Sequence, residues 1–265
     1  MSDFSTPSNP IAARLATGEP CYIMAVRQAR TTAIVGIVQA TGHQGFYLDL
    51  QYATMSADTA AQLCHAGLLA GLTPLVRLPG PDGALCELLL EAGAQGIILP
   101  DVRTAAEARA LATWCRFPPR GERSTVVAGP HTRFAAPDQA ADRARIEAET
   151  LALAMLESPE AIEAAEEIAG VDGIDILFIG SNDLTSAMGI PGQYRHPRVQ
   201  EAYRNAIAAA AKHGKQVMVG GIRDAAIVAD YVEAGAARCF VTGLDTAMLT
   251  AGAAASIAGF REVFG

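Results

Sequence analysis

The sequence alternates short apolar runs with alanine-rich stretches, and it does so eight times. Each apolar run is four to six residues long and nearly continuous in Val, Ile, Leu or Phe, without alternating polar residues. This pattern is typical of parallel strands that are covered by helices on both faces. Strands are therefore expected at residues 21–25, 45–50, 73–78, 96–99, 151–156, 174–179, 216–219 and 238–242.

The stretches between these runs carry the start and stop signals of helices. Ser56 and Ser158 are suitable N-caps, and Pro159 stands at the first helical position after the second of them. Gly71 and Gly214 fall where a left-handed residue would end a helix. Helices are expected at residues 56–70, 105–115, 158–169, 197–212 and 223–234.

Eight strand–helix units without a break in composition favour one (β/α)8 barrel, a single domain over residues 1–265 with residues 1–8 as a tail. A doubly wound open sheet is the alternative, but residues 25–31 lack the glycine-rich turn that such a sheet carries after its first strand. The main irregularity is the long connection 117–150 between the fourth and fifth strands. We expect this insertion to cover the active site, as barrel insertions often do.

Composition and charge exclude several classes of protein. The net charge of −8 and the lack of a basic run argue against nucleic acid as a partner. No run of roughly twenty apolar residues is present, and the first residues lack the order of a signal peptide, so we expect a cytoplasmic protein without a membrane span. The five cysteines form no CxxC pair and are interpreted as buried thiols in a reducing compartment.

Two acidic residues follow neighbouring strands, Glu157 after the fifth and Asp183 after the sixth. Adjacent strands lie about 5 Å apart, so the two carboxylates should converge. Two such anions repel each other unless a cation or a shared proton compensates. Without His or Cys at these positions, an oxygen-preferring divalent cation such as Mg²⁺ is favoured. Equally, each acid would serve as the cap of the helix that follows it.

Groups that suit an anionic substrate follow two strands. Arg77 ends the third strand, where a guanidinium can bind the carboxylate of a 2-oxo acid; the alternative is a surface salt bridge. Gly180, Ser181 and Asn182 form a strand-to-helix turn whose amides can bind an anion, although many such turns look alike.

The insertion contributes weaker candidates. Arg120 and Arg123 stand on a Pro–Gly turn, where they either recognise substrate or hold the insertion onto the barrel. Both interpretations stay open at this point. His131 lies in the same segment and is expected to be solvated.

Five motifs in series resemble those of a known family. The segments VRLP, LLLEAGAQGIILPDV, FPPRGERS, MLES and GVDGIDILFIGSNDLTSAMG are similar, in order and spacing, to those of the HpcH/HpaI aldolase/citrate lyase family. These are metal-dependent class II pyruvate aldolases of the 2,4-dihydroxyhept-2-ene-1,7-dioate and 2-dehydro-3-deoxyglucarate aldolase type. The resemblance runs from about Asn9 to the last helix. It implies a barrel of the phosphoenolpyruvate/pyruvate-binding type and a lyase that splits a 4-hydroxy-2-oxo acid into pyruvate and an aldehyde through a metal-stabilised enolate, or runs the reverse addition.

The resemblance also implies roles for individual residues. It implies that Glu157 and Asp183 bind the metal, which is Mg²⁺ or Mn²⁺, with Co²⁺ as a further option. It also implies that Arg77 and the amides of the turn 180–182 bind the carboxylate of the substrate. Glu91 takes the place of an acid that works with a neighbouring subunit's active site. Family members form dimers and hexamers and exchange their last helix, so residues 246–264 are expected to pack on a second copy.

One departure from the family concerns proton transfer. Where the family carries Asp-x-Glu-His, this chain reads Asp49-Leu50-Gln51-Tyr52, so a tyrosine replaces the histidine. Met155 likewise stands where the family has glutamine. Tyr52, with an ordinary pKa near 10, is then the candidate acid/base. A metal-bound water supported by Asp49 or Glu91 is the other.

The departure leaves other functions open on the same site. Oxaloacetate decarboxylation and a citrate-synthase-like condensation need the same enolate with less demanding proton delivery. A citrate-lyase-type acyl-CoA lyase and a barrel that only binds a 2-oxo acid are further alternatives. Candidates for the aldehyde half are Arg27 and Gln28 after the first strand, and Arg133 and Phe134 in the insertion.

Overall fold

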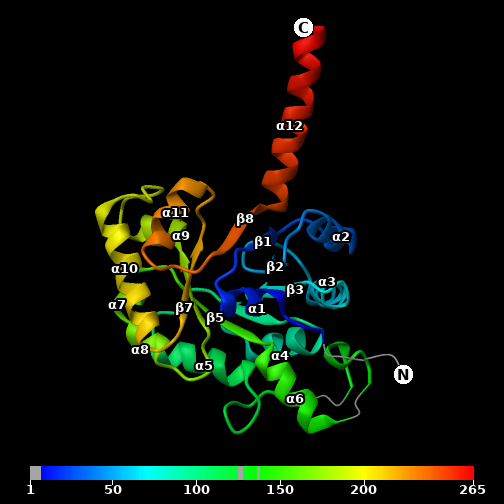
Figure 1. The fold of residues 1–265 in the computed structure, drawn as a ribbon, viewed down its shortest axis with the longest axis vertical. Coiled ribbons are helices and arrows are strands. Elements are labelled where there is room, and N and C mark those ends of the chain that lie inside the picture. Colours follow the sequence, from blue (N-terminus) through cyan, green and yellow to red (C-terminus); the bar gives the residue numbers. More distant parts are fainter. Residues whose placement is uncertain (1–6, 125–127, 136–137) are drawn as a thin grey trace.

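Eight parallel strands close into a barrel in the computed structural model, which describes residues 7–124, 128–135 and 138–265 (Figure 1). Each strand pairs with the next in chain order, and the last pairs with the first. The predicted single barrel is therefore confirmed. The strands are β1 Cys21–Val26, β2 Gly45–Asp49, β3 Thr73–Arg77, β4 Gly96–Leu99, β5 Leu151–Leu156, β6 Ile176–Gly180, β7 Gln216–Gly220 and β8 Cys239–Leu244.

The helices cover the outside of the barrel. Ser56 and Ser158 accept hydrogen bonds from the amides of Thr59 and Ala161, so both are N-caps as predicted. The helix expected at 158–169 is instead two short helices that meet at Ala164. The helices are α1 Pro10–Thr17, α2 Ala33–Ala40, α3 Ala57–Leu69, α4 Gly83–Glu91, α5 Ala105–Cys115, the 3-10 turn η1 Pro130–Thr132, α6 Gln139–Ala148, α7 Pro159–Glu163, α8 Ala165–Ala169, α9 Ser181–Ala187, α10 Pro197–Lys212, α11 Ala225–Glu233 and α12 Asp245–Phe264.

The core has two layers, one inside the barrel and one between the strands and the helices. Tyr47, Met155 and Phe178 belong to the inner layer, whereas Phe46 and Leu177 pack against the helices. Every residue of β2 to β6 is buried, because each strand is covered on both faces. This burial explains why the apolar runs in the sequence are continuous.

The last strand of the barrel, β8, pairs unequally with its two neighbours. β8 pairs with β1 through five residues, from Cys21↔Cys239 to Ala25↔Leu244. With its neighbour in the chain, β7, it shares the single register pair Val219↔Phe240. The last strand is therefore held mainly by the first one.

The insertion 117–150 does not cover the end of the barrel where the active site was expected, so that prediction was wrong. It follows α5, which has already returned the chain to the N-terminal ends of the strands, and α6 lies at the end of the barrel opposite α12 (Figure 1). None of its described residues lines the pocket at the C-terminal strand ends. Residues 125–127 and 136–137 of this segment, like residues 1–6 of the predicted tail, lie outside the described part of the chain.

Contacts of the insertion show that its polar residues attach it to the barrel. Arg120 forms ion pairs with Glu147 and Asp172, and the buried Arg123 bonds to Glu91. His131 is buried, not solvated as expected: its ring nitrogen lies 2.7 Å from the carbonyl oxygen of Leu90. Burial, assisted by the charge of Arg123, lowers the pKa of His131 to about 4.

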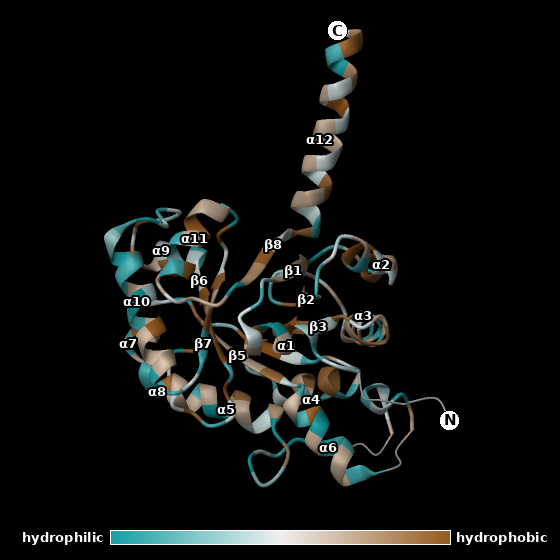
Figure 2. Ribbon diagram, in the orientation of Figure 1, coloured by the Kyte–Doolittle hydropathy of each residue, from teal (hydrophilic) through white to brown (hydrophobic). Residues whose placement is uncertain are grey.

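Helix α12 projects away from the barrel (Figures 1 and 2). It buries no residue against its own subunit. Its exposed apolar side chains are Leu249, Ile257, Phe260, Val263 and Phe264. No helix in the described residues combines the length and the apolar character needed to cross a membrane.

Candidate active site

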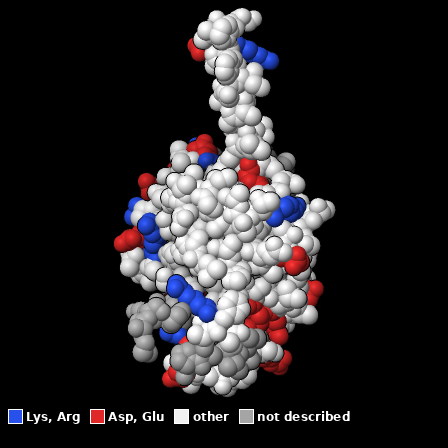
Figure 3. All heavy atoms as spheres, turned by 90° about the vertical axis from the view of Figure 1, so that its right-hand side faces the viewer, with Lys and Arg blue, Asp and Glu red and all other residues white. Residues whose placement is uncertain are grey.

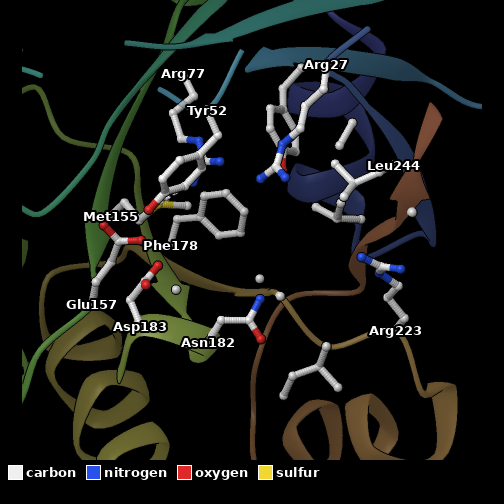
Figure 4. Close-up of a pocket in the computed structure, with 18 residues that line it drawn as sticks. Arg27, Tyr52, Arg77, Met155, Glu157, Phe178, Asn182, Asp183, Arg223 and Leu244 are labelled. Atoms are coloured by element: carbon white, nitrogen blue, oxygen red, sulfur yellow. Dashed lines mark hydrogen bonds between the residues drawn. The ribbon is translucent and has the colours of Figure 1, made fainter. Parts of the chain in front are cut away.

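A pocket opens at the C-terminal ends of the strands and contains about 640 Å³ of empty space, part of it open to solvent. Its walls come from the ends of seven strands and from the loop after β2 (Figure 4). Among the lining residues are Arg27, Tyr52, Arg77, Met155, Glu157, Phe178, Asn182, Asp183, Arg223 and Leu244.

Glu157 and Asp183 converge on one side of this pocket, as the strand order predicted (Figure 4). Glu157 accepts a hydrogen bond at Oε2 from the amide of Asp101, at 3.0 Å. Its Oε1 lies against Gly180, where a Cβ would come within 2.5 Å of that oxygen. A side chain at position 180 would therefore displace the carboxylate of Glu157.

Neither acid caps a helix. Ser158 is the N-cap of α7, and Gly180 precedes α9, whose first turn contains Asp183. The capping interpretation was thus wrong for both. Burial, followed by the negative charge of Asp183, raises the pKa of Glu157 to about 7. The two carboxylates repel each other and lack a compensating ion pair among the described residues.

Two close carboxylates without nitrogen or sulfur neighbours form a donor set for a hard divalent cation. Within residues 7–124, 128–135 and 138–265 no group of three or more His, Cys, Asp or Glu side chains is placed to hold a metal. Water and substrate oxygens would have to complete the coordination of such a cation. This arrangement suits Mg²⁺, which usually keeps several water ligands.

Arg77 lies in the pocket wall and is held by the fully buried Asp49. Its Nε and Nη2 donate to the two carboxylate oxygens of Asp49 at 3.0 and 2.7 Å. Arg27 donates from Nε to the same carboxylate at 2.5 Å. Burial alone would raise the pKa of Asp49, but hydrogen bonds and charge from both arginines hold it below its usual range. Asp49 therefore orients the two arginines and does not itself line the pocket.

Tyr52 stands between these arginines. Its ring centre lies 5.1 Å from the guanidinium carbon of Arg27 and 4.9 Å from that of Arg77. The hydroxyl points toward Glu157 (Figure 4). Burial, then the charges of Asp183 and Glu157, raise the pKa of Tyr52, so the phenol is neutral at pH 7.

The turn after β6 contributes two of its three predicted residues to the pocket, Gly180 and Asn182. Ser181 is fully buried, and its Oγ lies 2.6 Å from Oη of Tyr203 in the core. Oη of Tyr194 donates to Oδ1 of Asn182 at 2.6 Å. The amide nitrogen of Asn182 is thereby turned into the pocket (Figure 4).

Glu91 is not part of this pocket. It is the last residue of α4, which runs back to the opposite end of the barrel, and it binds Arg123 there. Glu91 therefore does not contribute to the pocket of its own subunit, and its role at the active site of a neighbouring subunit stays a prediction. Of the candidates for the aldehyde half, Arg27 lines the pocket, whereas Gln28, Arg133 and Phe134 do not.

Two further residues at the strand ends were not identified as candidates from the sequence. Arg223 lines the pocket three residues after the end of β7. Asp245, directly after β8, accepts hydrogen bonds from the amides of Arg27, Gln28 and Ala29 at 3.1, 2.9 and 2.8 Å. Its position directly after a strand was the signal that could have identified it.

Comparisons with known proteins found similar sequences and a similar fold. The family model of HpcH/HpaI aldolase/citrate lyase matches residues 27–251. A 4-hydroxy-4-methyl-2-oxoglutarate aldolase from Hapsidospora irregularis is 34% identical over 220 residues, which cover 81% of this chain and 80% of that protein. A hydroxypyruvate/pyruvate aldolase from Delftia acidovorans is 33% identical over 258 residues, 96% of this chain and 93% of that one. The crystal structure of an HpcH/HpaI aldolase from Desulfitobacterium hafniense has a TM-score of 0.88 at 29% identity and covers 96% of this chain and 97% of its own.

Proposed function

Because the chain belongs to the HpcH/HpaI aldolase/citrate lyase family, we infer that it is a class II aldolase. It cleaves a 4-hydroxy-2-oxo acid to pyruvate, or to a related 2-oxo acid, and an aldehyde, and it catalyses the reverse addition. The main observation in support of this pocket as the active site is that Glu157 and Asp183 converge in it and that Arg77 lines it as well.

We propose that Glu157 and Asp183 hold a divalent cation, Mg²⁺ or Mn²⁺, with Co²⁺ as a further option. The raised pKa of Glu157 supports this role, since a cation would relieve the repulsion between the two carboxylates. When bound there, the cation supplies a Lewis acid that stabilises negative charge developing on the 2-oxo group.

The chain's own side chains bind and orient the substrate. Nη1 of Arg77 is the guanidinium nitrogen that is not bound to Asp49. Among the described residues it donates to the weak acceptor Sδ of Met155, at 3.7 Å, so it can donate to the carboxylate of the 2-oxo acid instead. The amides that begin α9, next to Gly180, are a second donor group for that carboxylate. Asp49 fixes the guanidinium before substrate arrives, which lowers the ordering cost of binding.

Cleavage breaks the C3–C4 bond of the substrate. The proton of the C4 hydroxyl leaves, and the electron pair of the bond passes to the enolate of pyruvate, which is then protonated at C3. Tyr52 is the titratable side chain that faces this region from the arginine side. As a neutral phenol it donates its proton to the C4 oxygen in the addition direction and is left as a phenolate; in cleavage it is the phenolate that takes the proton of the C4 hydroxyl.

A second candidate reaction is the decarboxylation of oxaloacetate on the same site. It forms the same enolate and needs no base at a C4 hydroxyl. The raised pKa of Tyr52 favours it, because a phenol of this kind is a poor proton acceptor at pH 7. Comparing the turnover of oxaloacetate with that of a 4-hydroxy-2-oxo acid separates the two reactions.

We also propose that the protein is a homo-oligomer, a dimer or a hexamer, in which α12 packs on a second copy. The apolar side chains of α12 have no cover in their own subunit. The side of the barrel over α2 and α3 is largely free of charged side chains and exposes Ile37 and Leu69 (Figure 3). This side offers a surface of matching character for such a helix.

The exchange of the methyl protons of pyruvate with deuterium tests the site, since it reports enolisation alone. Glu157→Gln and Asp183→Asn should each lower the metal-dependent exchange rate at least a hundredfold. Glu163→Gln, an exposed acid on α7, should leave the rate unchanged. Undiminished exchange in either site variant would show that the carboxylate pair is not the metal site.

A further inference from the structure

Helix α12 is attached to its own barrel at one end (Figure 1). It has 20 residues, which corresponds to a length of about 30 Å, and it buries none of them against its own subunit. Its first turn touches the barrel: Cε of Met248 lies 3.1 Å from the place that a Cβ of Gly243 would take, and Asp245 bonds to the loop after β1. Whatever holds the far end of α12 therefore also sets the direction of its first turn.

The carboxylate of Asp245 joins this first turn to the loop after β1. Its Oδ1 accepts from the amides of Arg27 and Thr246 at 3.1 and 2.8 Å. Its Oδ2 accepts from the amides of Gln28 and Ala29 at 2.9 and 2.8 Å. One carboxylate thus binds three amides of the loop and one of the helix. The conformation of residues 27–29 therefore depends on where the first turn of α12 lies.

The side chain of Arg27 extends this dependence into the active site (Figure 4). Its Nε donates to Oδ2 of the fully buried Asp49 at 2.5 Å. The same oxygen accepts from Nη2 of Arg77 at 2.7 Å, and Oδ1 accepts from Nε of Arg77 at 3.0 Å. Because two guanidinium groups share one carboxylate, a displacement of Arg27 shifts Asp49 and with it Arg77. Arg77 is the side chain to which the proposed function assigns the carboxylate of the 2-oxo acid.

We propose that Asp245 is a positioning residue that couples self-association of the protein to binding of the 2-oxo acid. When a second copy holds α12, Asp245 fixes the loop, and Arg27 and Asp49 keep Arg77 in place for the substrate. In a separated copy α12 can change its direction, and the cost of ordering the loop and Arg77 weakens binding. Linkage requires the reverse effect as well, so the bound 2-oxo acid strengthens self-association. This inference rests on the proposed function and on the proposed packing of α12 on a second copy.

The proposed metal site lies outside this series of contacts. Glu157 and Asp183 follow β5 and β6, which lie across the barrel from β1. Glu157 accepts its hydrogen bond from the amide of Asp101. The coupling should therefore change the affinity for the 2-oxo acid and leave the affinity for the metal unchanged. A general loss of stability would not produce such a split.

The test compares the wild type with Phe260→Glu, with Asp245→Asn and with the variant that carries both changes. Phe260 is exposed near the free end of α12, so its replacement acts through the packing of that helix. Sedimentation gives the state of assembly. Calorimetry on the Mg²⁺-loaded proteins gives the affinity for oxamate, an unreactive mimic of pyruvate, and the KM of pyruvate in the deuterium exchange is the second measure.

Phe260→Glu should dissociate the oligomer and weaken oxamate binding at least about fivefold, a usual size for coupling between two sites. Asp245→Asn should weaken it similarly, because asparagine has one acceptor oxygen and turns N–H donors toward the amides. In the double variant the two effects should not multiply, since both changes interrupt the same contact. In the wild type, oxamate should lower the protein concentration at which the oligomer dissociates.

Two controls exclude a merely structural effect. The affinity for Mn²⁺, measured by electron paramagnetic resonance, should be the same in all these proteins. Glu163→Gln, an exposed acid on α7, should keep the wild-type affinity for oxamate and the wild-type assembly. Melting temperatures show that each variant is folded at the temperature of the measurement.

The outcomes separate this inference from the proposed function. A dissociated Phe260→Glu protein or an Asp245→Asn protein with wild-type affinity for oxamate would overturn the coupling, and so would effects that multiply in the double variant. A monomeric wild type, or a Phe260→Glu protein that stays assembled, would overturn it as well. In all these cases the aldolase assignment stands if the wild type exchanges the methyl protons of pyruvate. A wild-type protein that fails to exchange them contradicts the proposed function itself.

Discussion

Glu157 makes the stability of the metal-free protein depend on pH. Its pKa is raised from 4.5 to about 7 in the folded state. Between these values the folded chain holds a proton that the unfolded chain has released, so the free energy of unfolding falls as the pH rises. The loss should begin near pH 4.5, be complete above about pH 7, and amount to at most about 3 kcal/mol.

Urea unfolding at pH 5 and pH 8 checks this prediction. Glu157→Gln should flatten the difference between the two pH values and should be the more stable protein at pH 8. Glu163→Gln serves as the control, because its exposed side chain should keep the wild-type profile. An unchanged pH profile in Glu157→Gln would assign the dependence to another group.

Residue positions at the ends of strands were predictable, whereas side-chain directions were not. Glu157 and Asp183 were found by counting strands, because neighbouring strands bring their ends together. Ser181 was predicted for the backbone amide of its turn, which stays a prediction; the sequence did not indicate that its side chain points into the core toward Tyr203. Arg223 escaped notice because the loop that carries it depends on the positive φ of Gly221, which the sequence does not specify.

At the scale of elements, the start of α12 is tied to the loop after β1. The carboxylate of Asp245 accepts three backbone hydrogen bonds from this loop, which carries Arg27. Burial would raise the pKa of Asp245, but these amides hold it below its usual range. The stabilisation is therefore present at neutral pH and is lost as the pH falls through that lowered pKa.

Asp245→Asn should lower the free energy of unfolding at pH 7 by about 1–2 kcal/mol, because a neutral amide oxygen replaces a charged acceptor. The deficit should shrink in acid, where the wild-type carboxylate is protonated as well. Asp58→Asn, on the surface of α3, is the control and should change stability by less than about 0.5 kcal/mol. A deficit that is equal at pH 7 and in acid would show that the charge of Asp245 does not matter.

At the same scale, the insertion 117–150 shows that an irregular segment can be recognised in the sequence and still be assigned to the wrong end of the barrel. The insertion 117–150 was recognised as irregular, but its position was inferred from the habits of barrel loops. Helix α5 lies between β4 and the insertion, and each such helix returns the chain to the other end of the barrel. Because α5 returns the chain to the N-terminal ends of the strands, the sequence order alone could have placed the insertion and Arg123 far from the pocket. Glu91 lies at the same end of the barrel because it is the last residue of α4.

For the whole molecule, the uncovered face of α12 predicts association. Phe260→Glu should dissociate the oligomer, because a carboxylate would be buried in an apolar contact, and analytical ultracentrifugation should show a smaller sedimenting species. Arg261→Glu changes charge at the next position of the same helix and should have a much weaker effect. The barrel of the dissociated variant should stay folded, because α12 buries no residue in its own subunit. A wild-type protein that sediments as a monomer would refute the prediction.

The uneven pairing of β8 has a consequence for synthesis on the ribosome. The strand that completes the barrel is held by five residues of β1 and by one of β7, so its partner is the first strand to be made. Until residues 239–244 have left the exit tunnel, β1 keeps an unpaired edge and the barrel interior stays open. Closure of the barrel therefore waits for its last strand, and until then the nascent chain depends on protection of the open edge of β1 from aggregation.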